Sequence, residues 1–213
     1  MVQLKFEGIK RLLFIGAHSD DIEIGCGGFI IQNADRINEL GIEVDWVVCT
    51  GSESVRKQEA QKGFEAFSGK IKKKTIQILD FEDGVMLMER TRLRQTLANL
   101  PVPDMVFTHY LEDRHQDHRF VSEMTHNAFR RSYVLEYEVI KYDWDLGNPT
   151  CFVVLDGDTV DRKAALLMDC FGSQRSKDWF DEETFKGLAR IRGVQCHAPY
   201  AEGFYARKNV LTL

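Results

Sequence analysis

The stretch AHSDDIEIGCGG, residues 17–28, decides how the fold is interpreted, because it follows the first apolar run and joins charged residues to glycines. The preceding residues 12–16 are short, apolar and typical of a buried strand. Gly25, Gly27 and Gly28 predict a tight turn that packs the next helix, expected over residues 27–40, close to this strand. The stretch therefore predicts a strand followed by a helix, with polar side chains between them.

The next hundred residues alternate between apolar runs and segments of helical periodicity. They predict strands at residues 44–49, 75–79 and 105–108, and helices at 55–67, 89–100 and 117–130. The strands are too apolar to face water on either side. This order predicts an α/β fold, in which helices cover both faces of a mostly parallel sheet.

From about Tyr133 the alternation changes. Strands are expected at residues 139–142, 152–155 and 203–206, and helices at 158–170 and near 181–190. No repeat or low-complexity linker divides the chain. We therefore expect a single domain over residues 1–213, in which the last third is a C-terminal elaboration.

The composition excludes several classes of function. The 213 residues are 44% hydrophobic and 29% charged, as in a globular protein, and the net charge of −5 disfavours nucleic acid as a partner. No apolar run is long enough for a secretory signal or a membrane span. The five cysteines are widely spaced and form no C-x-x-C pair, which favours reduced thiols and a cytoplasmic protein.

The second half of the opening stretch has a nucleotide-binding interpretation. Glu23 and the glycines that follow it look like the loop that binds S-adenosylmethionine in methyltransferases. Such a loop follows its strand directly, whereas here the polar residues 18–21 intervene, and Ile30 stands where the dinucleotide pattern needs a small residue. We therefore expect no organic cofactor.

The first half of the stretch indicates a metal site. His18, Asp20 and Asp21 follow the first predicted strand, and His115 and His118 follow the fourth, within THYLEDRHQDHRF at residues 108–120. The carboxyl ends of parallel strands meet at one edge of a sheet. Two histidines, one carboxylate and a position left for water are a common catalytic zinc set. Helix capping is the alternative role for an aspartate here, but it explains only one of these residues.

Together, AHSDDIEIGCGG and DRHQDH resemble the motifs of the PIG-L/LmbE-like zinc-dependent N-deacetylases, which remove acetyl groups from amino sugars. The first family motif commonly reads A-H-P-D-D-x-E-x-G-x-G-G, and Ser19 stands here in place of its proline. Proline fixes φ but supplies no ligand, so the ligands are retained. Weaker matches are VRKQEA at 55–60, FEDG at 81–84 and YAEGF at 200–204. The resemblance implies a Rossmann-like fold.

The resemblance also implies a role for each matching position. His18, Asp21 and His118 would bind Zn²⁺, or another divalent first-row metal that accepts the same ligands. Asp20 would be the general base, and His115 would face the substrate carbonyl. Asp117 would orient His115. Arg56 and Asp83 would contact the sugar.

The predicted function is hydrolytic removal of an N-acetyl group from a small amino sugar or its conjugate, by zinc-bound water with Asp20 as general base. One alternative is a related amidase acting on a sugar conjugate, and another is a non-catalytic, metal-dependent sugar-binding domain. Retention of Asp20 and His115 argues against the latter, because binding alone needs neither. The loop at residues 133–149 is where we expect specificity to lie, and a homo-oligomer is compatible with the sequence.

Overall fold

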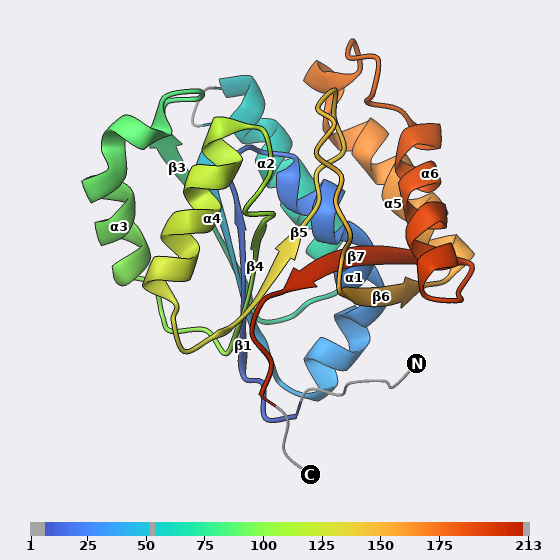
Figure 1. The fold of residues 1–213 in the computed structure, drawn as a ribbon, viewed down its shortest axis with the longest axis horizontal. Coiled ribbons are helices and arrows are strands. Elements are labelled where there is room, and N and C mark those ends of the chain that lie inside the picture. The colour runs from blue at the N-terminus through green and yellow to red at the C-terminus, as the bar shows by residue number, and fades with distance from the viewer. Residues whose placement is uncertain (1–6, 52–53, 211–213) are drawn as a thin grey trace.

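A seven-stranded sheet forms the centre of the computed structural model, which describes residues 7–51 and 54–210 (Figure 1). The spatial order is β3-β2-β1-β4-β5-β7-β6. Strands β1 to β5 are parallel, and β7 runs antiparallel to both β5 and β6. The strands span Arg11–Gly16 (β1), Glu43–Thr50 (β2), Lys74–Phe81 (β3), Met105–His109 (β4), Tyr133–Tyr137 (β5), Cys151–Leu155 (β6) and Tyr200–Ala206 (β7). The predicted α/β fold with a mostly parallel sheet is confirmed.

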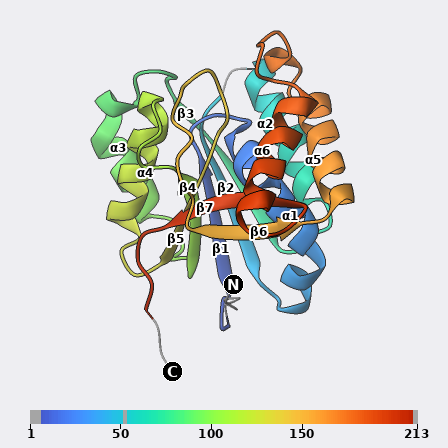
Figure 2. The ribbon, with the colours of Figure 1, turned by 45° about the vertical axis from the view of Figure 1, so that its right-hand side comes forward.

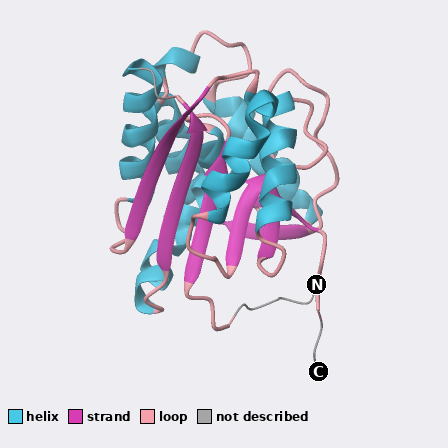
Figure 3. Cartoon of the chain, turned by 90° about the vertical axis from the view of Figure 1, so that its left-hand side faces the viewer, coloured by secondary structure: helices cyan, strands magenta, loops and turns pink. Residues whose placement is uncertain are grey.

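Helices cover both faces of this sheet (Figures 2 and 3). One layer contains α1 (Asp21–Glu39), α2 (Ser54–Ser68), α5 (Gly157–Cys170) and α6 (Glu182–Gln195), and the other contains α3 (Arg90–Ala98) and α4 (Gln116–Ala128). Two short 3₁₀ helices lie at Met86–Glu89 (η1) and Gly172–Gln174 (η2). None of the helices in the described ranges is both long and apolar enough to cross a membrane.

The two cores explain the apolar character of the strands. On β1, Leu12 and Phe14 pack toward the layer of α1 and α2, whereas Leu13 and Ile15 pack toward that of α3 and α4. All four side chains are at most 3% exposed. A strand buried on both faces reads as a continuous apolar run rather than as an alternating one.

The connections place a reversal of strand order at the centre of the sheet. From β1 the chain proceeds through β2 to β3 on one side, then returns through α3 to β4 on the other side of β1. The carboxyl ends of β1 and β4 lie side by side at one end of the sheet, and the segments that follow them leave in opposite directions. Open α/β sheets bind their ligands at such a reversal of strand order.

The start of α1 differs from the prediction. The helix begins at Asp21 instead of residue 27, so Gly25, Gly27 and Gly28 lie within it, and the predicted turn is wrong. A Cβ at these positions would lie 2.2 Å from Tyr137, 2.5 Å from Phe67 and 2.4 Å from Leu155, respectively. The glycines are thus needed for close packing of α1, and this part of the prediction is confirmed.

The strand predicted at residues 139–142 is also wrong. The chain forms β5 earlier, at Tyr133–Tyr137, where it pairs in register with β4. The last pair joins Tyr137 to His109, the residue at which β4 ends. Because β4 offers no further backbone partner, the next residues leave the sheet as a loop.

A buried ion pair is inserted at the backbone of α1. The amides of Gly28 and Phe29 donate to the Glu202 carboxylate, each at 2.7 Å, and Lys163 donates to the Ile24 carbonyl at 2.6 Å. Lys163 also lies 2.7 Å from Glu202. In a regular helix the Gly28 amide would donate to Ile24. Glu202, in the YAEGF match, thus bonds to the helix that carries Asp21.

We predict that Gly25→Ala lowers the free energy of unfolding by about 1–3 kcal/mol, because its methyl group would overlap the Tyr137 ring. Urea denaturation of the two proteins measures the difference. Gly187→Ala is the matched control, since Gly187 lies in α6 with nothing within 4 Å of its added Cβ, and it should stabilise by about 0.5–1 kcal/mol. Equal stabilities for the Gly25→Ala and Gly187→Ala variants would contradict the packing described for α1.

Candidate functional site

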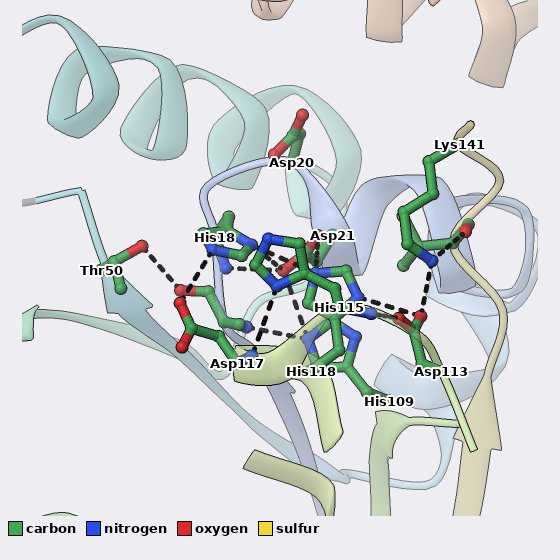
Figure 4. Close-up of polar contacts among 12 residues, drawn as sticks. His18, Asp20, Asp21, Thr50, His109, Asp113, His115, Asp117, His118 and Lys141 are labelled. Carbon is green, nitrogen blue, oxygen red and sulfur yellow. Dashed lines mark hydrogen bonds and ion pairs between the residues drawn. The ribbon is translucent and has the colours of Figure 1, made fainter. Parts of the chain in front are cut away.

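Three segments converge beyond the carboxyl ends of β1 and β4 (Figure 4). They are residues 17–21 after β1, residues 83–84 after β3, and residues 109–118 from the end of β4 to the first turn of α4. Gly16 permits the tight passage from β1 into α1, because a Cβ there would lie 3.0 Å from Ile22 and 3.2 Å from the His18 carbonyl. Sequence-distant side chains therefore meet in one cluster.

His18, Asp21 and His118 form the centre of this cluster. His18 Nδ1 lies 3.1 Å from His118 Nε2, and the Asp21 carboxylate oxygens lie 3.3 Å from His18 Nδ1 and 3.4 Å from His118 Nε2. Ligand atoms around a tetrahedral zinc ion, with bonds of about 2.0–2.1 Å, are about 3.4 Å apart. The three side chains therefore have the spacing and the chemistry of a site that could hold one metal ion.

Further groups in the cluster surround His18. His18, His115 and His118 have ring nitrogens within 4.8 Å of one another, and His18 forms a similar group with the Asp83 and Asp117 carboxylates. His18 Nε2 lies 2.9 Å from Asp83 and 3.6 Å from Asp117. Nδ1 of His18 thus faces Asp21 and His118, whereas Nε2 faces the Asp83 and Asp117 carboxylates. A carboxylate that bonds the ring nitrogen opposite the metal orients an imidazole for metal binding.

Asp113, which the sequence analysis quoted within DRHQDH without a role, orients His118. Its carboxylate lies 3.0 Å from His118 Nδ1 and accepts a hydrogen bond from Lys141 at 2.9 Å. Burial opposes ionisation of Asp113, but the hydrogen bond with His118 and the charge of Lys141 lower its pKa. A carboxylate beside Nδ1 places the proton there and leaves Nε2 free as a ligand.

His109 is the second residue that the sequence analysis gave no role. Its ring is fully buried, stacks on His118 with centroids 3.9 Å apart, and accepts the Ala17 amide at Nε2 over 2.9 Å. Nε2 also lies 3.2 Å from Asp21. Burial and the charge of His118 lower the pKa of His109 to about 4. His109 is therefore neutral at neutral pH and forms one wall around Asp21.

The electrostatics of the cluster favour a cation. Burial disfavours the charged Asp21 carboxylate, yet His118, His109 and His18 outweigh it and lower the pKa well below its ordinary value. Burial likewise opposes charge on His18, but Asp21 and Asp117 raise its pKa well above the ordinary value. An ionised carboxylate at this depth needs positive charge beside it. Protons on imidazole supply that charge here, and a metal ion bound by the same atoms would supply it too.

Asp20 lies beside this cluster and bonds elsewhere. Its carboxylate accepts from Arg56 at 2.8 Å, and it lies above the histidine rings in Figure 4, apart from the contacts drawn there. Arg56 also donates to Glu59 at 3.0 Å and to Ser173 at 3.2 Å. The guanidinium expected to contact sugar is thus held by protein acceptors, and it fixes the position of Asp20.

His115 is the N-cap of α4. Its Nδ1 accepts the Asp117 backbone amide at 3.3 Å, which assigns the proton of the neutral ring to Nε2. Burial lowers the pKa of His115, and the charges of His118 and His18 lower it further. His115 therefore offers an N–H donor as a neutral imidazole.

The Asp117 carboxylate has a different partner from the expected one. It accepts the Gly84 amide at 2.6 Å and faces His18, so the hydrogen bond that orients His115 comes from the Asp117 backbone. Asp83 is 71% exposed in its side chain, and its hydrogen bond with His18 lowers its pKa to about 2. Of the two predicted sugar contacts, Asp83 is thus the accessible one.

The fold and this cluster define a doubly wound α/β protein with a buried His/Asp site at its strand-order reversal, and comparisons with known proteins agree. The family model PIG-L, described as GlcNAc-PI de-N-acetylase, matches residues 13–129, more than half of the chain. An uncharacterised deacetylase of Escherichia coli, YaiS, is 28% identical over 140 residues, which are 61% of this chain and 74% of YaiS. The chain belongs to the PIG-L family of deacetylases.

Two solved structures share the fold. The conserved protein TT1542 from Thermus thermophilus matches with a TM-score of 0.74 and 23% identity, over 95% of this chain and 96% of that one. GalB, the 4-carboxy-2-hydroxymuconate hydratase from Pseudomonas putida, matches with a TM-score of 0.72 and 20% identity, over 96% and 99%. Since a hydratase has this fold, the fold alone leaves the reaction open.

We predict about one equivalent of divalent metal per chain in the purified protein, measured by elemental analysis. His18→Ala and His118→Ala should each remove most of it, because each deletes one of three closely spaced donors. Cys26→Ala is the control: Cys26 is fully buried in α1, apart from the cluster, and its loss should leave the metal in place. Undiminished metal in both histidine variants would refute this site.

Proposed function

We propose that this chain is a zinc-dependent N-deacetylase that acts on a small N-acetylated amino sugar or its conjugate, with residues 1–213 as one catalytic domain. The observation that supports the proposal is the presence of Asp20 and His115 beside the His18, Asp21 and His118 donors: Asp20 precedes Asp21 in the chain, and the His115 ring lies 4.8 Å from that of His18. Binding alone would need only the three donors, whereas hydrolysis also needs a base and a donor. Membership of the PIG-L family supports removal of an acetyl group.

His18, Asp21 and His118 would hold the metal. Bound there, zinc would polarise the amide carbonyl and lower the pKa of water. The outer contacts of these ligands fit that role: Asp113 bonds His118, and Asp83 bonds His18. Each contact fixes a ring by a carboxylate on the nitrogen that faces away from the centre.

Asp20 would accept the proton of the attacking water and deliver it to the amine that leaves. Its neighbour Asp21 faces the histidines, whereas Asp20 is held by Arg56 at 2.8 Å. The guanidinium keeps the carboxylate in one orientation, and Glu59 and Ser173 fix the guanidinium in turn. Arg56 is therefore a positioning residue in this proposal.

His115 would stabilise the oxyanion that forms from the amide carbonyl. Because its Nδ1 accepts the Asp117 amide, the Nε2–H is available for donation without protonation of the ring. A donor placed on a developing oxyanion typically contributes about 3 kcal/mol to catalysis. Asp83, exposed at the rim, would accept a hydrogen bond from a sugar hydroxyl.

We predict that the metal-loaded protein releases acetate and a free amine from an N-acetylglucosamine-like compound, measured by coupled acetate assay over a panel of N-acetylated sugars and conjugates. Chelation should abolish release and added zinc should restore it, because the proposed reaction needs a metal to polarise the carbonyl and to lower the pKa of water. A related amidase would release a larger acid instead, and a hydratase would add water to a C=C bond without releasing acetate. Acetate release that survives verified metal removal would contradict the mechanism.

Asp20 and Asp21 should respond differently to the same substitution. Asp20→Asn should keep its metal and lose about 10²–10⁴-fold in kcat, because an amide accepts no proton from water. Asp21→Asn should instead lose metal, because it loses the carboxylate that lies 3.3 Å from His18 and 3.4 Å from His118. Elemental analysis and kcat measured on the same preparations separate the two effects. Near-normal turnover by Asp20→Asn would assign the base to another group.

A further inference from the structure

The loop between β5 and β6 exposes aromatic and apolar side chains. Tyr142, Trp144 and Leu146 occupy alternate positions in this loop and are 68%, 81% and 43% exposed. Leaving an indole of this size in water is unfavourable unless it meets a partner. The mechanism proposed above uses none of these three side chains.

A buried network anchors this loop to Asp113 and Arg114, the residues that precede His115. Lys141 donates to both Asp113 and Asp145, at 2.9 and 2.8 Å, and Asp145 accepts the Arg114 amide at 2.8 Å. The side chains of Lys141, Asp113 and Asp145 are 9%, 3% and 5% exposed. Trp144 therefore stands on a fixed segment, tied to the residue that precedes His115 and to the carboxylate that orients His118.

Arg114 holds the indole in one orientation. Its guanidinium carbon lies 4.1 Å from the centroid of the Trp144 ring, a cation–π contact. With one face beside Arg114 and 81% of the residue exposed, the opposite face of the ring is open. In Figure 1 the loop rises above β5 beside the segment that precedes α6, and Tyr142 contacts Trp179 of that segment edge-on, with centroids 6.3 Å apart.

We propose that Trp144 is a stacking platform for a second pyranose ring of the substrate, joined to the amino sugar whose amide is cleaved. A pyranose has a C–H face that packs on an aromatic ring and a rim of hydroxyl groups. Arg114 contacts the ring, and Asp143 precedes Trp144 in the chain with a side chain that is 43% exposed, so both can bond such hydroxyls. A plain acyl chain could pack on the ring, but it offers no hydroxyl group for these two side chains to bond. This assignment rests on the proposed deacetylase function.

The test compares two substrates that share the reacting end, N-acetylglucosamine and its β-linked disaccharide. Trp144→Ala should raise KM for the disaccharide about tenfold while changing its kcat, and both constants for the monosaccharide, by less than about twofold. Trp144→Phe should restore most of the disaccharide affinity, because it keeps a ring. Val102→Ala, another exposed apolar residue, at the opposite end of the sheet, is the control and should change neither substrate.

A binding measurement separates this proposal from the deacetylase function. The disaccharide should change the tryptophan emission of the wild-type protein, and Trp144→Phe should lose most of that change, because Trp46 is fully buried and Trp179 is partly buried against Tyr142 and Phe180. Binding without acetate release from either sugar would refute the deacetylase function and leave the platform supported. Turnover of both sugars that Trp144→Ala leaves unchanged, or lowers equally, would overturn the platform. An effect confined to a monosaccharide with a longer N-acyl group would overturn it as well.

Discussion

The buried carboxylate of Asp21 is the constraint on which this structure depends. It is the first residue of α1, only 3% exposed, and it accepts the His18 amide at 2.6 Å. Isolated charges at such depth are unstable unless they are paired. The pairing comes from His18 and His118, and the chain brings His118 to the end of β1 by placing β4 beside that strand. The strand order and the polar cluster are thus consequences of one another.

Close packing of α1 carries this constraint into the rest of the fold. The glycines of its first two turns lie against Tyr137, Phe67 and Leu155, and Glu202 bonds the helix backbone from β7. The C-terminal strands therefore support the helix that begins with Asp21, although they contribute no residue to the His/Asp cluster described above. This explains in physical terms why the YAEGF segment accompanies the two main motifs: its glutamate supports the position of the site.

The sequence predicted the alternation of elements and the meeting of His18, Asp21 and His118, because buried parallel strands and polar strand ends leave direct patterns. It missed His109 and Asp113, whose roles depend on which ring nitrogen faces which carboxylate. His109 is the last residue of β4, so the strand-end rule that selected His18 was a signal for it as well. The early start of α1 was missed because glycine favours turns locally, and only the packed neighbours show why a helix needs it.

The fold does not determine the reaction, because a hydratase has the same architecture. What distinguishes amide cleavage is the second half of the reaction, in which an amine must leave with a proton. In the proposed mechanism Asp20 would supply that proton, which requires its carboxylate to stay near the reacting atoms after it has accepted one. The contact with Arg56, itself fixed by Glu59 and Ser173, provides this restraint from a helix outside the metal donors. In this proposal the features that favour a deacetylase therefore lie beside the candidate metal donors, in groups that would hold and return a proton.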